Sequence, residues 1–330
     1  MKKVALIGVG TMGRTHCNAY LSIEDAKLVA VCDINEEKAN MLCEKHGAKS
    51  YTDYETMISN EEFDILDICL PTYLHSKYAI DAMKRGKNVF CEKPIALTLE
   101  EAEEMTKTAK EYGVKFSVGH VLRFFPQYKN AVSIVNDGKI GSPRLIRTTR
   151  NQAFPNWSWE NWYADYSKSG GPILDLVIHD IDWIIASFGD IERVYASSFN
   201  GKVEKQEHCM CILRLKNGAI AHVEGSWAYP QGSVFRMTYE VVGTDGEIEY
   251  DSVKDSPILI QTNNDGVHKN EYLNPMYGNA EPYGAEIRAF VEAVDQNKDV
   301  VIKGEDAIKA LKVCLACIKS SETGESVTID

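Results

Sequence analysis

A carboxylate and an imidazole four residues apart form the first pair in this chain that could move a proton. Asp175 and His179 lie in the segment 170–180, where Gly-Gly-Pro precedes an apolar run. Proline favours the first turn of a helix, so we expect a helix that begins just past the glycines. Residues i and i+4 share one helix face, where the carboxylate can orient the imidazole, as proton transfer requires. The alternative is a polar stripe on a half-buried helix.

A lysine that closes a buried strand is the second candidate for chemistry. Lys93 stands between Glu92 and Pro94, directly after the apolar run 88–91. A cation held rigidly at a strand end could polarise a substrate oxygen and stabilise a developing alkoxide. The other interpretation is an ordinary surface residue at the end of a strand.

The elements that precede these residues follow a dinucleotide-binding pattern. An apolar strand at 3–7 leads into Gly8-Val9-Gly10-Thr11-Met12-Gly13 and a helix-like stretch, and a second apolar strand, 28–32, ends at Asp33. The glycines allow close approach of a pyrophosphate, which a helix N-terminus attracts. Asp33 could accept hydrogen bonds from the adenosine ribose and would repel a 2′-phosphate. Neither Ile34 nor Asn35 would hold that phosphate, so the sequence predicts NAD, with NADP disfavoured.

Strands and helices then alternate through residue 120, which predicts a doubly wound parallel sheet. Ligands of such sheets bind at the carboxyl ends of the strands. The further cofactor-binding candidates at those ends are Leu70, Pro71, Thr72, His75, Glu92, Lys93 and Pro94. For His75 two interpretations stay open: it lines the nicotinamide ribose, or it begins a helix.

The pattern changes near residue 143. Six segments between 144 and 250 read as strands, with hairpin turns at Asn217-Gly218 and Asp245-Gly246. We therefore expect an NAD-binding domain over 1–120 and an α+β substrate domain with a large, mostly antiparallel open sheet over 121–330. Helices at 172–187, 284–296 and 304–320 are expected to cover one face of that sheet.

The strand segment 209–213 is apolar at both alternating sets of positions, whereas a strand with one solvated face alternates with polar residues. We expect another subunit to cover the second face, which makes the protein a homo-oligomer, a dimer or a tetramer. Local irregularity of the strand is the alternative explanation.

An aromatic segment, 154–163, holds three of the five tryptophans. Such side chains suit stacking on a sugar ring, although a loop anchored by aromatic packing has the same composition. Candidate substrate contacts are Trp162, Arg123 and Tyr283.

Taken together, these motifs resemble the family of glucose–fructose oxidoreductase, inositol dehydrogenase and the rhizopine catabolism protein. The resemblance spans the chain, from the glycine motif through the segments 71–75 and 92–94 to Asp175 and His179. It implies hydride transfer between NAD and a secondary alcohol of a sugar, cyclitol or sugar derivative. Lys93 would polarise the reacting oxygen and His179 would be the general base, paired with Asp175. Tyr73 departs from the family, where a small polar residue or asparagine is common.

Composition limits the other classes of function. A formal charge of −12 argues against nucleic acid or an anionic membrane as a partner, and no apolar run suggests a membrane span or signal peptide. The nine cysteines lie mostly in apolar patterns, typical of buried thiols in a reducing cytoplasm, and we expect core packing rather than a metal site at Cys314 and Cys317. Two other functions stay open: an NAD-dependent glycoside hydrolase that oxidises its substrate transiently, and a non-catalytic regulatory protein.

Overall fold

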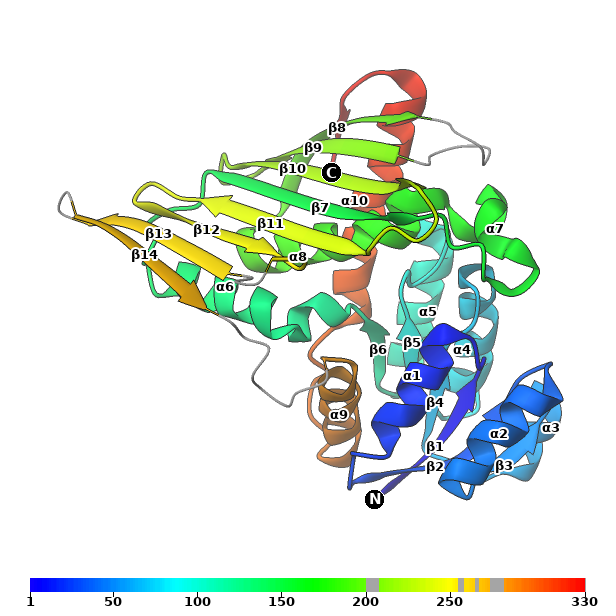
Figure 1. Cartoon of the computed structure of the whole chain (residues 1–330). Helices are drawn as coiled ribbons and strands as arrows, with labels where there is room; N and C mark the ends of the chain where they lie inside the picture. Colours follow the sequence, from blue (N-terminus) through cyan, green and yellow to red (C-terminus); the bar gives the residue numbers. More distant parts are fainter. Residues whose placement is uncertain (200–207, 255–257, 265–266, 274–281, 330) are drawn as a thin grey trace. The chain divides into compact units, whose positions relative to one another are not determined.

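The computed structural model describes residues 1–199, 208–254, 258–264, 267–273 and 282–329 (Figure 1). The chain forms two compact units. The first comprises Met1–Val121 and Ala280–Ile308, and the second comprises Leu122–Asn279 and Lys309–Asp330. Residues 280–308, which the sequence analysis groups with the second domain, therefore cluster with the first unit.

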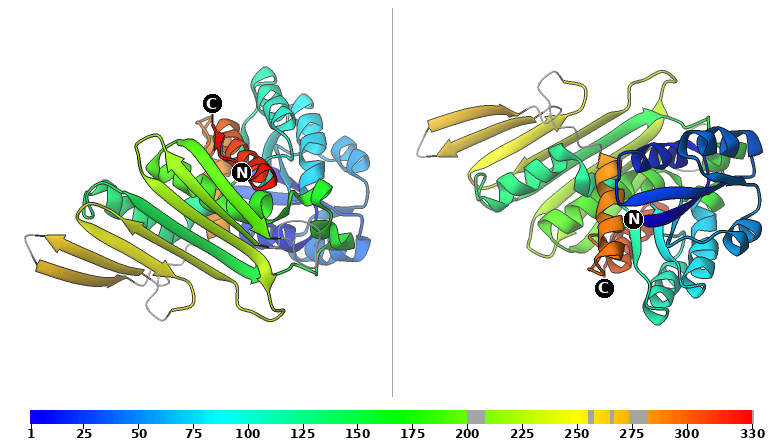
Figure 2. Two further views of the ribbon diagram at one scale, coloured as in Figure 1. Left: turned by 90° about the horizontal axis from the view of Figure 1, so that it is seen from above. Right: turned by 90° about the horizontal axis from the view of Figure 1, so that it is seen from below.

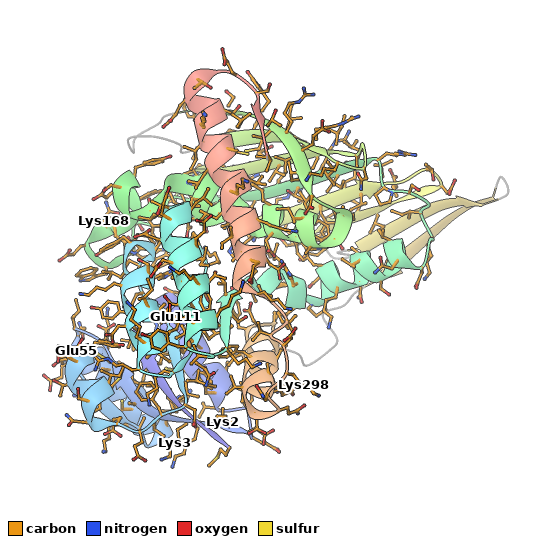
Figure 3. All side chains as sticks on the ribbon, turned by 180° about the vertical axis from the view of Figure 1, so that it is seen from behind. Lys2, Lys3, Glu55, Glu111, Lys168 and Lys298 are labelled. Carbon is orange, nitrogen blue, oxygen red and sulfur yellow. The ribbon has the colours of Figure 1, made fainter. Side chains whose placement is uncertain are left out.

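A six-stranded parallel sheet in the order β3-β2-β1-β4-β5-β6 forms the centre of the first unit. Apart from the short edge strand β3, its strands are mostly runs of buried apolar residues, as expected of a sheet covered on both faces. Figure 3 shows Lys2 and Lys3 on the outside of this unit, at the amino end of β1. The strands are β1 (Lys2–Ile7), β2 (Ala26–Cys32), β3 (Lys49–Tyr51), β4 (Ile65–Ile68), β5 (Asn88–Glu92) and β6 (Phe116–Gly119).

Helices cover both faces of this sheet, which confirms the doubly wound prediction. One hydrophobic cluster joins side chains of α1 (Thr11–Tyr20), α2 (Glu36–His46) and α9 (Pro282–Asp295) to β1, β2 and β5. The second helical layer comprises α3 (Tyr54–Asn60), α4 (His75–Lys84) and α5 (Leu99–Glu111). Tyr54 of α3 packs edge-on against Tyr78 of α4, and α4 contacts α5.

The placement of α9 corrects one expectation. A helix near 284–296 is expected on one face of the second sheet, and that expectation is wrong. Ile287, Phe290 and Val291 instead pack in the core of the first unit, where Phe290 lies 5.5 Å from the ring of Phe90 on β5. Helical periodicity identifies an apolar face, but it does not identify the sheet that the face covers.

The second unit is built on a nine-stranded sheet in the order β14-β13-β12-β11-β7-β10-β9-β8-β15. Only the β7–β10 pair is parallel among these described strands, so the expected mostly antiparallel sheet is confirmed. The strands are β7 (Leu145–Ala153), β8 (Ile191–Phe199), β9 (His208–Leu215), β10 (Ile220–Tyr229), β11 (Arg236–Val242), β12 (Gly246–Asp251), β13 (Ile258–Asn264), β14 (Val267–Leu273) and β15 (Val327–Thr328).

Helices pack on one face of the nine-stranded sheet (Figure 2). Tyr128 of α6 (Pro126–Asn136) and Trp183 of α8 (Ile178–Phe188) both contact the ring of Tyr239 on β11. The last helix, α10 (Gly304–Thr323), approaches β8, where the Ser320 hydroxyl accepts the backbone N–H of Ala196. The boundary between the two units falls inside α10.

The cysteines of β9 and α10 belong to the buried core of the second unit. Cys209, Cys211, Cys314 and Cys317 are all buried, and burial raises the pKa of the Cys314 thiol well above its ordinary value. Within the part of the chain that is described, no helix is long and apolar enough to cross a membrane.

Candidate functional site

The glycine motif forms a cradle between β1 and α1. A Cβ added to Gly13 would lie 1.8 Å from the carbonyl oxygen of Gly8, so the helix meets the turn only because Gly13 lacks a side chain. Gly8 has a φ of +90°, and a Cβ there would lie 2.6 Å from the carbonyl oxygen of Cys69. A Cβ on Gly10 would meet nothing within 4 Å. Among the described residues, no side chain caps the first turn of α1, which holds no acidic residue either. The backbone N–H groups of this first turn and the open space beside Gly10 suit an anionic pyrophosphate.

Asp33, directly after β2, faces this cradle. Its carboxylate accepts the Val9 N–H at 2.7 Å and the Asn35 N–H at 2.8 Å. A carboxylate offers about four lone-pair sites, so acceptor capacity remains for a ribose hydroxyl. Thr11 and Ile34 are exposed beside the cradle and Met12 is half-buried. The residues present therefore fit an adenine dinucleotide.

The ends of β4 and β5 carry the next group of candidates. Leu70 and Pro71 are half-buried, whereas Thr72 is buried at the start of a 3₁₀ turn (Thr72–Leu74). His75 begins α4 and is fully buried; its Nδ1 lies 2.8 Å from the carbonyl oxygen of Pro94 and its Nε2 lies 2.8 Å from that of Leu70. Both ring nitrogens thus face backbone carbonyls, which favours the second of the two interpretations of this residue.

Burial lowers the pKa of His75 below its ordinary value, although both carbonyls favour the protonated form. The ring joins the segment after β4 to the segment after β5. Its contact with Pro94 therefore fixes the backbone directly after Lys93, which is itself half-buried.

Sequence reasoning missed a buried polar cluster beneath the cradle. His16 of α1 is fully buried between the carboxylates of Asp67 on β4 and Glu92 at the end of β5. Tyr20 donates its hydroxyl to Asp67 at 2.9 Å, and the Cys69 sulfur lies 3.3 Å from Nδ1 of His16. Two features of the sequence could have indicated this cluster. His16 lies three residues past the last glycine of the motif, and Asp67 lies inside an otherwise apolar strand.

In the second unit, Asp175 lies in an unusual turn. The residues Ile173–Val177 form a π-helical turn that leads directly into α8, and Asp175 is buried while His179 is half-buried. The predicted helix after Pro172 is therefore present, but its first turn is wider than that of an α-helix. Single π-helical turns occur frequently at functional sites, where they re-aim side chains.

Two ion pairs fix α8 within the second unit. Arg123 donates from Nε and Nη2 to the two oxygens of Asp182, at 2.8 and 2.7 Å. Arg150 on β7 donates from Nε to Asp180 at 2.8 Å, and both side chains are buried. Burial raises the pKa of Asp180, whereas the Arg150 charge opposes that rise. Arg123, a candidate substrate contact, thus uses two of its donors to bind α8, the helix that carries His179.

The aromatic segment packs partly on itself. Trp162 stacks on Tyr163 with ring centroids 4.0 Å apart, and Tyr163 contacts Trp227 of β10. Trp157 and Trp159 remain exposed. The remaining candidate, Tyr283, belongs to the first unit, where its ring lies 6.4 Å from that of His16.

Comparisons with known proteins agree with this architecture. Two family models match: "Oxidoreductase family, NAD-binding Rossmann fold" over residues 2–120, and "Oxidoreductase family, C-terminal alpha/beta domain" over residues 132–329. The chain is 30% identical to a myo-inositol 2-dehydrogenase of Thermotoga maritima, over 99% of this chain and 98% of that protein. It is 29% identical to a scyllo-inositol 2-dehydrogenase (NAD(+)) of Bacillus subtilis, over 99% of this chain and 96% of that protein.

A solved structure of levoglucosan dehydrogenase with NADH and levoglucosan superposes with a TM-score of 0.89 at 25% identity, over 100% of this chain and 99% of that one. The matched family models together span most of the sequence. The chain therefore belongs to the glucose–fructose oxidoreductase, inositol dehydrogenase and rhizopine catabolism family, as an NAD-binding oxidoreductase.

Proposed function

We propose that this protein is an NAD-dependent dehydrogenase that transfers hydride between a secondary alcohol of a cyclitol or sugar derivative and nicotinamide. The observation that carries the proposal lies within the first unit. The glycine cradle with Asp33 fits an adenine dinucleotide, and Lys93 follows β5 at the carboxyl edge of the same sheet. The inositol dehydrogenases among the relatives favour a polyol as the substrate.

Three side chains carry the proposed chemistry. Bound NAD would supply the hydride acceptor. Lys93 would bind the reacting oxygen and stabilise the negative charge that develops on it. His179 would take the hydroxyl proton, and Asp175 would orient the imidazole and favour its protonated form. Arg123, Trp162 and Tyr283 remain proposed substrate contacts.

A substrate panel tests the reaction. Inositols, anhydrosugars and free sugars are offered with NAD, and the absorbance of the reduced cofactor is followed. Stoichiometric formation of reduced cofactor is the expected result. Release of a leaving group from a glycoside without net cofactor change would replace this proposal with the transient-oxidation hydrolase, and NAD binding without any turnover would favour a regulatory protein.

Variants test the assigned roles. Lys93→Ala should lower kcat by roughly 10²- to 10³-fold, because it removes the charge that stabilises the alkoxide. NAD affinity, measured by protein fluorescence, should stay nearly unchanged. Lys129→Ala, a change of another lysine outside the proposed site, serves as the control. Activity that survives in Lys93→Ala would contradict the assigned role.

We also propose that the protein is a homo-oligomer that associates through the helix-free face of the nine-stranded sheet. Met210 and Ile212 of β9 are 46% and 49% exposed on that face, and Tyr195 and Ile220 are exposed on the neighbouring strands. Ile212→Asp should dissociate the oligomer, as measured by light scattering after size exclusion. A wild-type monomer would refute this part of the proposal.

A further inference from the structure

The buried cluster beneath the glycine cradle places one imidazole between two carboxylates. Nδ1 of His16 lies 3.1 and 3.0 Å from the two oxygens of Asp67, and Nε2 lies 3.0 Å from Oε1 of Glu92. The three side chains come from α1, β4 and β5, and all are buried. The cluster therefore ties the helix that follows the glycine motif to two strands of the sheet.

The geometry fits a doubly protonated ring. Ionised carboxylates only accept hydrogen bonds, so both ring nitrogens must donate, and a neutral imidazole has a single N–H. Burial alone would lower the pKa of His16, but Asp67 and Cys69 outweigh it and hold the pKa well above its ordinary value. Burial alone would likewise raise the pKa of Glu92, which His16 lowers instead.

The carboxylate of Glu92 connects His16 to the backbone of Lys93. Its Oε1 faces His16, and its Oε2 accepts the backbone N–H of Lys93 at 3.1 Å. On the other side of the lysine, Nδ1 of His75 contacts the carbonyl oxygen of Pro94 at 2.8 Å. The backbone is thus held immediately before and immediately after Lys93, while the lysine side chain alone stays half-buried.

We infer that His16 and Glu92 are positioning residues that hold Lys93 where it meets the substrate oxygen. The inference rests on the role proposed above for Lys93. His16 is fully buried and Glu92 nearly so, and both carboxylate oxygens of Glu92 already bind protein groups. They act through Lys93 rather than on the substrate or the cofactor.

A metal ion is the competing occupant of the same atoms. Nδ1 of His16, a carboxylate oxygen of Asp67 and the sulfur of Cys69 lie within 4.8 Å of one another. Nδ1 of His16 approaches both oxygens of Asp67, which is the contact of a proton donor rather than of a metal ligand. The Tyr20 hydroxyl also donates to the Asp67 carboxylate. The geometry therefore favours the imidazolium.

The decisive variant is Glu92→Gln. A glutamine has one accepting oxygen and a donating NH2 group, so with His16 protonated it can accept from His16 or from the Lys93 N–H but not from both. We expect kcat to fall roughly tenfold to a hundredfold, because misplacing a catalytic group by ~1 Å has an effect of that size. KM and NAD affinity should change by less than about threefold, since the substitution removes no group that contacts the substrate or NAD in this proposal. His16→Gln should act in the same direction where the protein still folds.

Ser117→Ala is the matched control. Ser117 lies on β6 of the same sheet, is buried, and donates its hydroxyl to the carbonyl oxygen of Ile302 at 2.8 Å. This substitution also removes one buried hydrogen bond, but it leaves Glu92 and Lys93 untouched. It should lower stability with kcat unchanged. Equal losses of kcat in Glu92→Gln and Ser117→Ala would show that Glu92 is merely structural and would overturn the inference.

Hydrogen exchange separates this inference from the proposed function. The amide of Lys93, read by mass spectrometry of a fragment containing it, should exchange about fivefold faster or more in Glu92→Gln, and at the wild-type rate in Ser117→Ala. This readout needs no substrate. Unchanged exchange of the Lys93 amide in Glu92→Gln would refute the positioning role even if the wild-type protein is an active dehydrogenase. Faster exchange in that variant, together with a wild-type protein that shows no turnover, would refute the proposed function alone. A stoichiometric metal that resists chelation would also overturn the inference, because Nδ1 would then be a ligand.

Discussion

Each unit of the protein buries a set of paired charges, but the two sets use different cations. In the first unit His16 stands between Asp67 and Glu92, whereas in the second unit Arg150 binds Asp180. Arginine keeps its charge throughout the accessible pH range, but an imidazolium can lose its proton. The cation that holds α8 is therefore permanent, while the cation beside Glu92 depends on pH.

The two clusters also differ in what they hold. The Arg150–Asp180 pair joins strand β7 to helix α8, so it fixes an element as a whole. The His16 cluster ends on a single backbone N–H, that of Lys93. A buried ion pair that anchors a helix should act mainly on stability, and one that ends on a catalytic residue should act mainly on rate.

The largest expected effect comes from breaking the arginine pair. Arg150→Met leaves Asp180 buried without its partner, and we expect a loss of about 3–5 kcal/mol in the free energy of unfolding, measured in urea. Arg147→Met is the control on the same strand, because Arg147 pairs with Glu240 at the surface and should contribute less than about 1 kcal/mol. Similar losses in both variants would contradict the distinction between buried and exposed pairs.

The second prediction concerns pH. Because the pKa of His16 is raised in the folded state, its contribution is fully present below the unfolded pKa of about 6.5 and is lost as pH rises through the folded value. Wild type should therefore lose more unfolding free energy between neutral and alkaline pH than His16→Gln does. Tyr20, Cys17 and Cys69 face the same cluster, and their raised pKa values add an alkaline loss that both proteins share.

Arg150→Met sharpens this result. The arginine does not titrate in the same range, so the variant should keep the alkaline slope of wild type while its whole stability curve is lowered. Parallel pH profiles for wild type and His16→Gln would show that the imidazolium contributes nothing to stability.

The smallest effect is expected from Asp33, a carboxylate at the half-exposed rim of the cradle rather than in a buried pair. Asp33→Ser removes the charge that repels a 2′-phosphate, and the ratio of kcat/KM for NAD to that for NADP should fall by about tenfold. The comparison is made at constant salt with the substrate that the panel identifies. An unchanged ratio would mean that other groups set the cofactor preference.

Much of the architecture could be predicted from local patterns. The glycine motif, the buried strand before it and Asp33 after the second strand are consecutive in the sequence, and the structure assembles them as their order indicates. The hairpin at Asn217-Gly218 likewise follows from two adjacent residues, and Gly218 has a φ of +91°. The turn around Asp175 was predicted as a helix, but no sequence pattern indicated its π-helical form.

Contacts between distant segments could not be predicted in this way. Asp67 and Glu92 are separated from His16 by 51 and 76 residues. In the sequence, Asp67 is one polar residue inside an apolar strand and Glu92 is one polar residue at the end of another. Which sheet receives α9 depends on a core shared with Phe90, far away in the chain. Such pairings are set by the register of the sheet and by packing, which a single sequence does not encode locally.

The assignment of α9 to the first unit has a consequence for protein synthesis. Ile287, Phe290 and Val291 complete the core around β1 and β5, and Ser117 bonds to the carbonyl of Ile302. On the ribosome, the first 120 residues emerge long before this helix, so the nascent nucleotide-binding fold exposes an apolar surface while strands β7 to β14 of the second sheet are translated. We expect chaperones to bind the growing chain during that interval, and release to follow the arrival of residues 280–308.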